Sequence, residues 1–387
     1  MKVGYMPMFP SLHADLTDAE MLRAELRIAA MTEAAGYDAI GLPEHHFDEY
    51  SMCVDNLQTL IWLAAKTEHI ELGSAALILP WWSQPLRLAE KISTMDAIAP
   101  GRYLIGFGRG LSRMEYDTFG ILMHETRERF DEAARMIVGV IQTGFIESAG
   151  PFYPQKRTEI RPRPRRDLKN RLYAVAMSAE SAKAIAVLDC RMMTFVQLEM
   201  ERHLPNIELF RCEYRRNHRQ EPGPTLLIDF SYCDQDSGRA EEVARTHLAT
   251  NYLSILKHYE FMEGVHKDIK GYEDYAQASA FLHSLGLEKT VEDYVAHQAW
   301  GTPQQILDTL ERRRAMIGDF EWISIMSFGG MPFDRVEKSM RLLAQEVLPE
   351  VQSWGEVRAA RARLRASLTR RRQVRSRLFD FHLTVCG

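Results

Sequence analysis

The sequence predicts a (β/α)₈ barrel, and three observations support that fold class. Eight short runs rich in β-branched and aromatic residues alternate with longer stretches in which apolar residues recur every three or four positions. The chain has 387 residues, a length that a single α/β barrel commonly reaches. Residue types that start and stop helices stand at the expected boundaries. A doubly wound open sheet is the alternative that periodicity leaves open, although it usually has fewer strands.

Strands are expected where β-branched and aromatic residues cluster between turn residues. The candidate strands, in chain order, are residues 3–9, 39–42, 70–79, 103–108, 173–176, 192–196, 225–232 and 322–328. Between them, apolar residues at helical spacing predict helices that pack on the outside of the barrel. The candidate helices are residues 19–35, 85–98, 126–143, 179–188, 204–217, 239–253 and 303–317.

Capping residues support several of these boundaries. Thr17 and Glu20 have the spacing of a capping box, and Gly36 stands where a C-cap glycine is expected. Thr302 followed by Pro303 is typical of an N-cap and first helical position. These signals place helix ends where the periodicity also changes.

Two long segments interrupt the alternation. Residues 146–171 are rich in Pro, Arg and Lys, which predicts an irregular loop on the barrel rim. Residues 251–300 follow the seventh strand, so we expect this insertion to lie over the mouth of the barrel. The predicted organisation is one barrel domain, residues 1–355, followed by an Arg-rich extension, residues 356–387.

Composition describes an ordinary globular chain, with 46% hydrophobic and 26% charged residues. No apolar run is long enough for a membrane span, and the N-terminus lacks the features of a signal peptide. The five cysteines contain no C-x-x-C pair, which fits reduced thiols. We therefore expect a cytoplasmic protein without an integral membrane segment.

The net charge of −5 is unevenly distributed. Residues 356–387 contain nine Arg against two acidic residues, a charge of +7, so the remaining chain carries −5 − 7 = −12. An acidic body argues against nucleic-acid binding. The basic extension is either a contact for an anionic partner or membrane surface, or a dispensable tail.

The end of the second candidate strand carries Glu44, His45 and His46. Catalytic residues of barrels lie at such strand ends, and histidine exchanges protons near neutral pH. Neighbouring strand residues point to opposite sides, so one imidazole can face the barrel axis while the other packs behind it. Hydrogen-bonded rim histidines are the alternative. The diverging directions argue against a shared metal ion, and we predict no metal site.

The fourth and fifth strand ends together predict an anion site. Arg109 stands between Gly108 and Gly110, which lets the backbone approach a ligand closely. Ser178 is a suitable N-cap for a following helix, whose free amides attract anions. A guanidinium beside such a helix start suits a phosphate monoester. A structural salt bridge for the arginine and simple capping for the serine remain the alternatives.

Apolar residues crowd the remaining strand ends, where they either form core or line a hydrophobic, adaptable pocket. They are Met6, Met8, Phe9, Trp81, Trp82, Met192, Met193, Phe195, Met326 and Phe328. The chain contains none of the P-loop, H-E-x-x-H, G-x-S-x-G or EF-hand motifs. Its G-x-G-x-G run does not match the dinucleotide fingerprint. A generic hydrolase therefore has no evident nucleophile or metal.

Five of these motifs, taken in order, resemble bacterial luciferase and its flavin-dependent monooxygenase relatives over residues 1–350. They are Glu44-His45-His46-Phe47, Gly73-Ser74-Ala75-Ala76-Leu77-Ile78-Leu79-Pro80, Gly101-Arg102-Tyr103 with Gly106-Phe107-Gly108-Arg109-Gly110-Leu111, Ala176-Met177-Ser178-Ala179-Glu180-Ser181, and Trp300-Gly301-Thr302-Pro303-Gln304. Single motifs are weak, but five in sequence at strand ends are specific to the family, and much less so to a substrate.

The resemblance implies a (β/α)₈ barrel, usually a homodimer, that binds reduced FMN and forms a C4a-peroxyflavin with O₂. A separate flavin reductase would supply the reduced FMN, because the chain has no nicotinamide fingerprint. The substrate would be a small lipophilic aldehyde, ketone or terpene-like molecule. The insertion would be a mobile lid over the site.

The resemblance also assigns site residues. The catalytic group would be His45, with His46 and Glu44 beside it. The residues implied to hold FMN are Ala75 and Ala76 (against the ring, through a cis peptide), Gly108, Arg109, Met177, Ser178 and Ser181. The residues expected to face the substrate are Met8, Phe9, Trp81, Glu115 and Phe328.

The sequence departs from luciferase itself at three positions. Gly108 replaces the reactive cysteine, Val196 replaces an aromatic residue, and Met177 replaces an acidic residue. The resemblance therefore does not carry light emission or aldehyde specificity. Two alternatives from the same superfamily remain: a deazaflavin-dependent hydride-transfer enzyme, and a non-catalytic flavin-binding protein. The intact His45 argues against the second.

Overall fold

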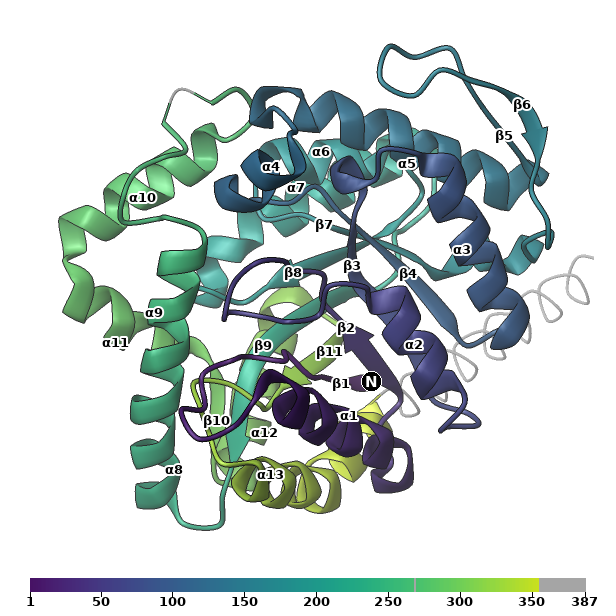
Figure 1. Ribbon diagram of the computed structural model, residues 1–387. Coiled ribbons are helices and arrows are strands. Elements are labelled where there is room, and N and C mark those ends of the chain that lie inside the picture. The colour runs from purple at the N-terminus through teal and green to yellow at the C-terminus, as the bar shows by residue number, and fades with distance from the viewer. Residues whose placement is uncertain (268, 355–387) are drawn as a thin grey trace, which may run out of the picture.

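A computed structural model describes residues 1–267 and 269–354 of the chain (Figure 1). Its strands lie inside a ring of helices, and the described part ends close to the first strand. The amino group of Met1 donates hydrogen bonds to the carbonyls of Val351 and Gln352 (both 3.0 Å), so the two ends of the barrel domain are tied together. The predicted extension at residues 356–387 lies outside the described residues.

The sheet is closed, which confirms the predicted barrel and excludes an open doubly wound sheet. The strands follow the ring order β9-β11-β1-β2-β3-β4-β7-β8, all pairings are parallel, and β8 pairs with β9 to complete the ring. The strands of the ring are β1 (Val3–Met6), β2 (Ala39–Leu42), β3 (Glu71–Ile78), β4 (Tyr103–Gly108), β7 (Leu172–Val175), β8 (Arg191–Phe195), β9 (Thr225–Cys233) and β11 (Phe320–Ile325).

Helices cover the outside of the barrel, as the apolar spacing predicts. Thr17 and Glu20 form the predicted capping box, Gly36 ends the first helix at φ 94°, and Thr302 caps another helix. The helices around the ring are α1 (Asp18–Ala35), α2 (Asn56–Ala64), α3 (Pro85–Ile98), α4 (Arg113–Phe119), α5 (Thr126–Thr143), α6 (Ala179–Ala186), α7 (Met200–His218), α12 (Pro303–Ile317) and α13 (Phe333–Glu346).

The segment at residues 146–171 is not the irregular loop that the sequence predicts. It contains most of an antiparallel hairpin, β5 (Phe145–Ser148) and β6 (Gln155–Glu159), and a 3₁₀ turn, η3 (Arg166–Arg171). The side chains of β6 are almost all exposed, so this strand has no buried apolar face that would produce an alternating pattern. The prediction was wrong for that reason.

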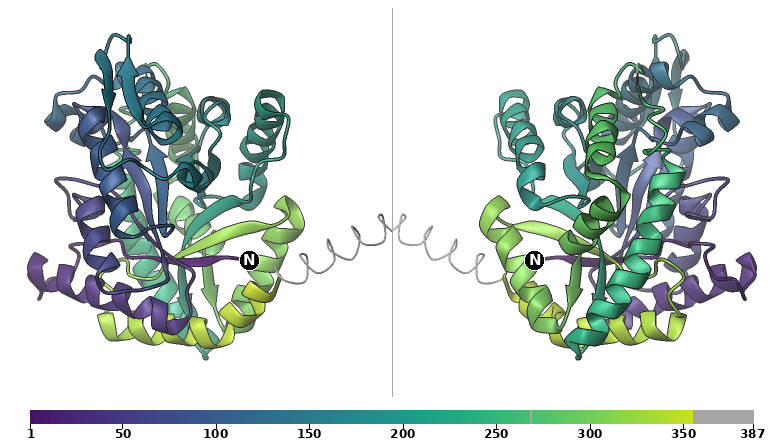
Figure 2. Two further views of the ribbon diagram at one scale, coloured as in Figure 1. Left: turned by 90° about the vertical axis from the view of Figure 1, so that its right-hand side faces the viewer. Right: turned by 90° about the vertical axis from the view of Figure 1, so that its left-hand side faces the viewer.

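The insertion after β9 is largely helical and stands along one side of the barrel (Figures 1 and 2). The predicted helix at residues 239–253 runs further in both directions and contains a π turn at Ala244–Leu248. The elements are α8 (Ser237–Val243), α9 (Ala249–His258), α10 (Glu273–Leu285), α11 (Leu287–His297) and β10 (Ala299–Gly301), which pairs in parallel with β9. None of the described helices has the length and apolar character to cross a membrane.

Small residues let β3 and β4 approach each other below the mouth of the barrel. A Cβ atom on Gly106 would lie 2.2 Å from the carbonyl oxygen of Ser74, so only glycine fits there. The Ser74 hydroxyl accepts a hydrogen bond from the Gly106 amide (3.0 Å). The next peptide bond, between Ala75 and Ala76, is cis, and the register shifts between Ser74 and Leu77. This irregular end of β3 forms one wall of the site.

Candidate active site

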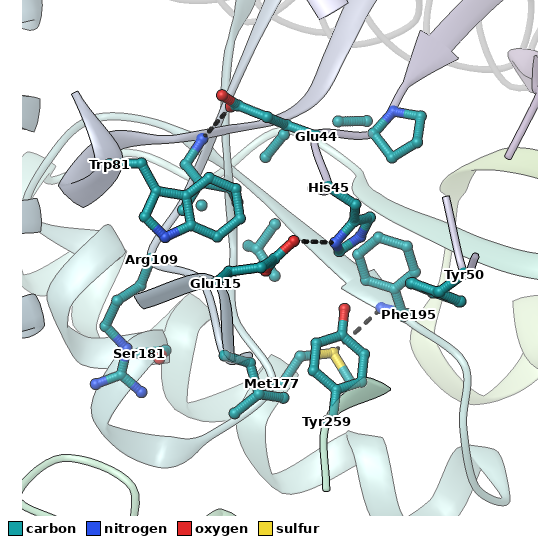
Figure 3. Close-up of a pocket in the computed structure, with 18 of the residues that line it drawn as sticks. Glu44, His45, Tyr50, Trp81, Arg109, Glu115, Met177, Ser181, Phe195 and Tyr259 are labelled. Carbon is teal, nitrogen blue, oxygen red and sulfur yellow. Dashed lines mark hydrogen bonds and ion pairs between the residues drawn. The ribbon is translucent and has the colours of Figure 1, made fainter. Parts of the chain in front are cut away.

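A cavity opens at the carboxyl ends of the barrel strands, where barrel enzymes place their catalytic residues (Figure 3). The space between the lining atoms, including the part open to solvent, measures about 960 Å³. The ends of β1, β2, β3, β4, β7 and β8 supply most of the wall, and the insertion closes it. The lining residues are Met8, Pro43, Glu44, His45, Tyr50, Ala75, Ala76, Ile78, Trp81, Gly108, Arg109, Gly110, Leu111, Glu115, Val175, Met177, Ser181, Phe195, Gln197, Tyr259 and Tyr275.

One end of the cavity gathers arginine and serine side chains, and we call it the anion-site candidate. The Arg109 guanidinium is largely buried and lies 3.2 Å from the carboxylate of Glu180. Arg127, from α5, contacts the same carboxylate at 3.2 Å and donates to the Ser181 hydroxyl (3.0 Å). Ser178 caps α6 and donates to Ser181 (3.1 Å). Two guanidinium groups and two hydroxyls therefore gather at a helix N-terminus, which favours an anion.

The insertion covers this anion site and supplies a carboxylate to it. Asp274 accepts a hydrogen bond from the amide of Ala179, the first residue of α6 (3.1 Å). The ring of Tyr272 lies 4.2 Å from the guanidinium carbon of Arg109. The amide at the start of α6 therefore donates to a carboxylate oxygen of the same chain, as expected at a helix N-terminus.

The opposite end of the cavity carries the histidine of the β2 end (Figure 3). His45 lines the cavity, whereas His46 turns away and packs edge-on against Trp81 at 5.1 Å between ring centres. Glu44 accepts a hydrogen bond from the Ile78 amide (2.7 Å), which joins the ends of β2 and β3. Burial raises the pKa of Glu44, against the opposing effect of that hydrogen bond.

Glu115, the third residue of α4, lies between the two ends and faces two imidazoles. Its Oε1 atom lies 3.4 Å from Nδ1 of His45 and 3.7 Å from Nε2 of His258, and it accepts the His46 amide (2.7 Å). Burial opposes ionisation of Glu115, but the adjacent imidazoles lower its pKa to about 2. Burial lowers the pKa of His45, despite the attraction of Glu115. At neutral pH the cluster therefore holds an ionised Glu115 beside a neutral His45.

The same cluster contains one group of residues that could hold a metal ion among residues 1–267 and 269–354. Candidate ligand atoms of His45, Glu115 and His258 lie within 4.8 Å of one another. The Glu115 carboxylate faces both imidazoles and accepts a hydrogen bond from a backbone amide. We therefore interpret this group as an acid–base cluster.

The walls between the two ends are apolar and partly flat. Ala75, Ala76 and Gly108 form a wall of small residues, and a Cβ on Gly108 would lie 2.6 Å from the Ile78 side chain and 3.2 Å from that of Ala76. Large side chains stand around the rest of the cavity: Met8, Tyr50, Trp81, Phe195, Tyr259 and Tyr275. Such a cavity suits a planar ring and an apolar molecule.

The structure brings eleven of the fifteen predicted site residues to the cavity wall. They are Met8, Glu44, His45, Ala75, Ala76, Trp81, Gly108, Arg109, Glu115, Met177 and Ser181. Ser178 does not line the cavity but donates a hydrogen bond to Ser181, which does. His46 packs against Trp81 outside the cavity. The expectation that Phe9 and Phe328 face a substrate is not met, because both are fully buried in the core, where Phe328 packs edge-on against Phe230.

Several residues at the site have no counterpart in the prediction. Arg127 is the second residue of a periodic helical stretch, and Tyr50 follows the end of β2 by eight residues. The insertion contributes His258, Tyr259 and Tyr275. A basic residue on an otherwise amphipathic helix face is the usual signal of a solvated surface, so only the folded arrangement identifies Arg127 as part of the anion site.

The fold and the site together define an α/β barrel with an anion site and an acid–base cluster at opposite ends of one cavity. The family model described as luciferase-like monooxygenase matches residues 1–319. The chain therefore belongs to the luciferase-like monooxygenase family, as the ordered motifs predict.

Two curated relatives are similar over most of their length. The alkanal monooxygenase alpha chain of Photorhabdus luminescens is 22% identical, over 86% of this chain and 92% of that protein. The oxygenase component of the flavin-dependent trigonelline monooxygenase of Acinetobacter baylyi is also 22% identical, over 86% of this chain and 91% of that protein.

Solved structures show the same fold. Monooxygenase RslO1 from Streptomyces bottropensis superposes with a TM-score of 0.70 at 23% identity, covering 90% of this chain and 99% of that one. The oxygenating constituent of 3,6-diketocamphane monooxygenase from Pseudomonas putida, solved with FMN, superposes with a TM-score of 0.69 at 13% identity. The match covers 90% of this chain and 98% of that one. An F420-dependent secondary alcohol dehydrogenase superposes with a TM-score of 0.67 at 14% identity, covering 90% of this chain and 98% of that one.

Proposed function

We propose that this protein is a monooxygenase that uses reduced FMN and O₂ to oxygenate a small lipophilic substrate. The observation that carries the proposal is the cavity itself, which has an anion site built on Arg109 at one end and His45 at the other. Membership of the luciferase-like monooxygenase family supports it, as does a relative described as the oxygenase component of a flavin-dependent monooxygenase.

The anion site fits the phosphate of FMN. Arg109 and Arg127 would carry the charge, and Ser178 and Ser181 would donate hydroxyl hydrogen bonds beside the first amides of α6. The carboxylate of Asp274, bound to the Ala179 amide, occupies the position that a phosphate oxygen would take. Phosphate binding therefore requires Asp274 to move.

The flat wall fits the ring system of the cofactor. Ala75, Ala76 and Gly108 leave room for a planar group to lie against the end of β3, with Met177 at the edge of the cavity. When bound, reduced FMN supplies the two electrons with which one oxygen atom enters the substrate and the other leaves as water. The residues of this chain would bind and orient the reactants and exclude water from them.

His45 is the group placed to move a proton. Its Nδ1 faces Glu115, and its lowered pKa keeps the ring neutral at neutral pH, so it can accept a proton from a reacting group. Glu115, ionised and held by the His46 amide, orients the ring and stabilises the cation that forms when His45 takes up a proton. Glu44 stays outside this exchange, because its carboxylate binds the Ile78 amide.

The walls also indicate the class of substrate. Trp81, Phe195 and Tyr259 present aromatic surface near His45, whereas the cationic groups lie at the other end. An uncharged lipophilic aldehyde, ketone or terpene-like molecule fits this arrangement better than an anionic one. Tyr259 and Tyr275, both from the insertion, close the cavity against water.

The charges around the phosphate position favour FMN over a deazaflavin with a longer anionic tail. Each basic group there already has an acidic neighbour: Arg109 and Arg127 share Glu180, and Lys270 pairs with Glu128. A separate flavin reductase is the proposed source of reduced FMN, and the family resemblance supports a cytoplasmic homodimer.

Oxygen consumption tests the proposal. The purified protein is supplied anaerobically with photoreduced FMN, then mixed with oxygenated buffer, and oxygen uptake and absorbance are followed with and without a medium-chain ketone. The expected result is that the bound reduced FMN reacts with O₂ and that the ketone gains one oxygen atom. Absence of FMN binding, or activity only with a reduced deazaflavin, contradicts the proposal.

A further inference from the structure

The helix α9 ends at a histidine that faces two carboxylates from different parts of the barrel. Nδ1 of His258 lies 3.1 Å from the carboxylate of Asp48, in the loop after β2, and Nε2 lies 3.7 Å from that of Glu115. The side chain of His258 is 0% exposed. Its ring centre is 5.1 Å from that of His45. Both ring nitrogens of this fully buried histidine therefore face carboxylates, and one of these carboxylates, that of Glu115, also faces His45.

The backbone around His258 is anchored to the same two elements. The Ser112 hydroxyl, at the N-cap of α4, donates to the carbonyl of His258 (3.3 Å). On either side, Lys257 pairs with Glu49 at 2.7 Å, and Glu260 pairs with Arg113, the first residue of α4. The end of α9 is thus fixed to the loop after β2 and to the helix that carries Glu115.

We propose that His258 is a positioning residue for the reaction site: brought in by the insertion, it lies between Asp48 and Glu115 and fixes the carboxylate that faces His45. This inference rests on the proposed function, because it assigns to His45 the proton transfer of that reaction. The inference goes beyond the proposed function because it makes the acid–base chemistry depend on the position of the insertion.

The surrounding charges support this role. Burial disfavours a charged His258, but Asp48 and Glu115 outweigh it and raise its pKa. The neighbouring His258 in turn lowers the pKa of Asp48. Beside burial, the nearby charge of His258 acts to lower the pKa of His45, and Glu115 acts in the opposite direction.

Two tyrosines that face this cluster add no charge to it. Tyr50 stacks on His258 at 4.8 Å between ring centres, and Tyr259 lies 4.7 Å from it. Burial raises the pKa of both hydroxyls, so both rings stay neutral in the range where histidine titrates. His45 titrates below the usual 6.5, where the raised pKa of His258 keeps that ring protonated and the lowered pKa values of Asp48 and Glu115 keep both carboxylates ionised.

The position of α9 decides how the Glu115 carboxylate is shared. His258 and His45 both face this carboxylate, so it stabilises a cation on His45 less strongly when His258 is protonated. The contact made by the end of α9 therefore favours the neutral form of His45.

Two substitutions separate this role from simple packing. His258→Asn retains an amide donor near Asp48 but carries no charge toward Glu115, whereas Asp48→Asn retains the ring and removes the carboxylate that favours its protonation. The matched control is His283→Asn, an exposed histidine on α10 of the same insertion. Thermal unfolding of each variant reports whether the fold is kept.

The first measurement is the titration of His45 in the FMN-free protein by NMR of imidazole resonances, with the His45 signal among the 13 histidines assigned from a His45→Gln variant. Removing a neighbouring cation is expected to raise the His45 pKa by about one unit in His258→Asn, and less in Asp48→Asn. The His283→Asn titration is expected to match the unmodified protein.

The second measurement is the pH profile of turnover with saturating reduced FMN. The acid limb of kcat is expected to move to higher pH by about one unit in His258→Asn, with a loss of up to about threefold at pH 7 that approaches tenfold on the acid limb, while KM and FMN affinity stay within about twofold. A packing role alone would leave the limb in place.

An unshifted His45 titration in His258→Asn overturns the inference. Stoichiometric binding of Zn²⁺ or Fe²⁺ to the unmodified protein, lost in His258→Asn, also overturns it and identifies a metal centre instead. Failure of the unmodified protein to bind FMN refutes the proposed function but leaves the NMR titration readable, so the two failures are distinguishable.

Discussion

The half of the site that the barrel strands build differs from the half that the insertion builds. The strand ends supply groups whose positions are fixed by the closed sheet: His45 after β2, the small residues of β3, and Arg109 after β4. The insertion supplies groups held by ion pairs and ring contacts, such as His258 and Asp274. One half therefore has positions set by the barrel itself, whereas the other half depends on how the insertion packs against the barrel.

The largest expected effect tests the strand half. His45→Ala removes the proton acceptor, so kcat is expected to fall by about 10²–10⁴-fold, with FMN affinity nearly unchanged. Turnover and calorimetric FMN binding check this together, with the exposed His69→Ala as the control. Full turnover in His45→Ala would remove the residue from the mechanism.

The next effect tests the anion site. Arg109→Ala removes a charge-assisted phosphate contact worth about 1.5–3 kcal/mol, so FMN affinity is expected to fall about 10- to 100-fold. Arg341→Ala, an exposed arginine on α13, is the control for a general loss of charge. Equal FMN dissociation constants for Arg109→Ala and the unmodified protein contradict the phosphate assignment.

A smaller effect, an increase in FMN affinity where the previous variant lowers it, tests the half of the site that the insertion builds. Asp274 binds the Ala179 amide that a phosphate oxygen needs, so Asp274→Ala is expected to tighten FMN binding about three- to tenfold. The exposed Glu263→Ala on the same insertion is the control for electrostatic repulsion alone. If both variants tighten FMN equally, the specific competition is ruled out.

The pH dependence of the unmodified protein sharpens the comparison further. His45 must be neutral to accept a proton, and its pKa lies below the usual 6.5 because the ring is buried. Turnover is therefore expected to fall only as the pH drops through that lowered value, and to differ by less than about twofold between pH 7 and 6.5. A kcat profile whose acid limb lies above pH 7 contradicts the lowered pKa.

The smallest effect on activity is expected for the core aromatic at the β11 end. Phe328 packs in the core and does not line the cavity, so Phe328→Leu is expected to leave KM unchanged while lowering the free energy of unfolding by about 1–2 kcal/mol. Denaturant titration and substrate kinetics of one preparation measure both. A raised KM with unchanged stability would return Phe328 to the substrate site.

Most of the fold and the strand half of the site could be predicted from the sequence, for a physical reason. Strands of a closed parallel barrel are buried on both faces and read as short apolar runs, and their ends converge, so Glu44, His45 and Arg109 can be placed from their distance to a strand. The hairpin β5–β6 could not be found this way, because its exposed strand carries no apolar pattern.

The insertion half could not be predicted because its contacts depend on three-dimensional docking. His258 is one histidine at the end of an ordinary helix, and only the fold places it between Asp48 and Glu115, which are 210 and 143 positions away in the sequence. For Phe9 and Phe328 the error is the reverse, because the sequence prediction placed at the site two residues that do not line it. Both follow strands, yet both are buried in the core, since a position near a strand end does not fix which way a side chain points.

The ion pairs that fasten the end of α9 also make the enzyme sensitive to its surroundings. Lys257–Glu49 and Arg113–Glu260 join partly exposed side chains, and dissolved ions screen such pairs over roughly 8 Å at physiological ionic strength. His258 itself is shielded from that screening by burial. Concentrated potassium chloride is therefore expected to weaken the two outer pairs before it affects the buried contacts of His258.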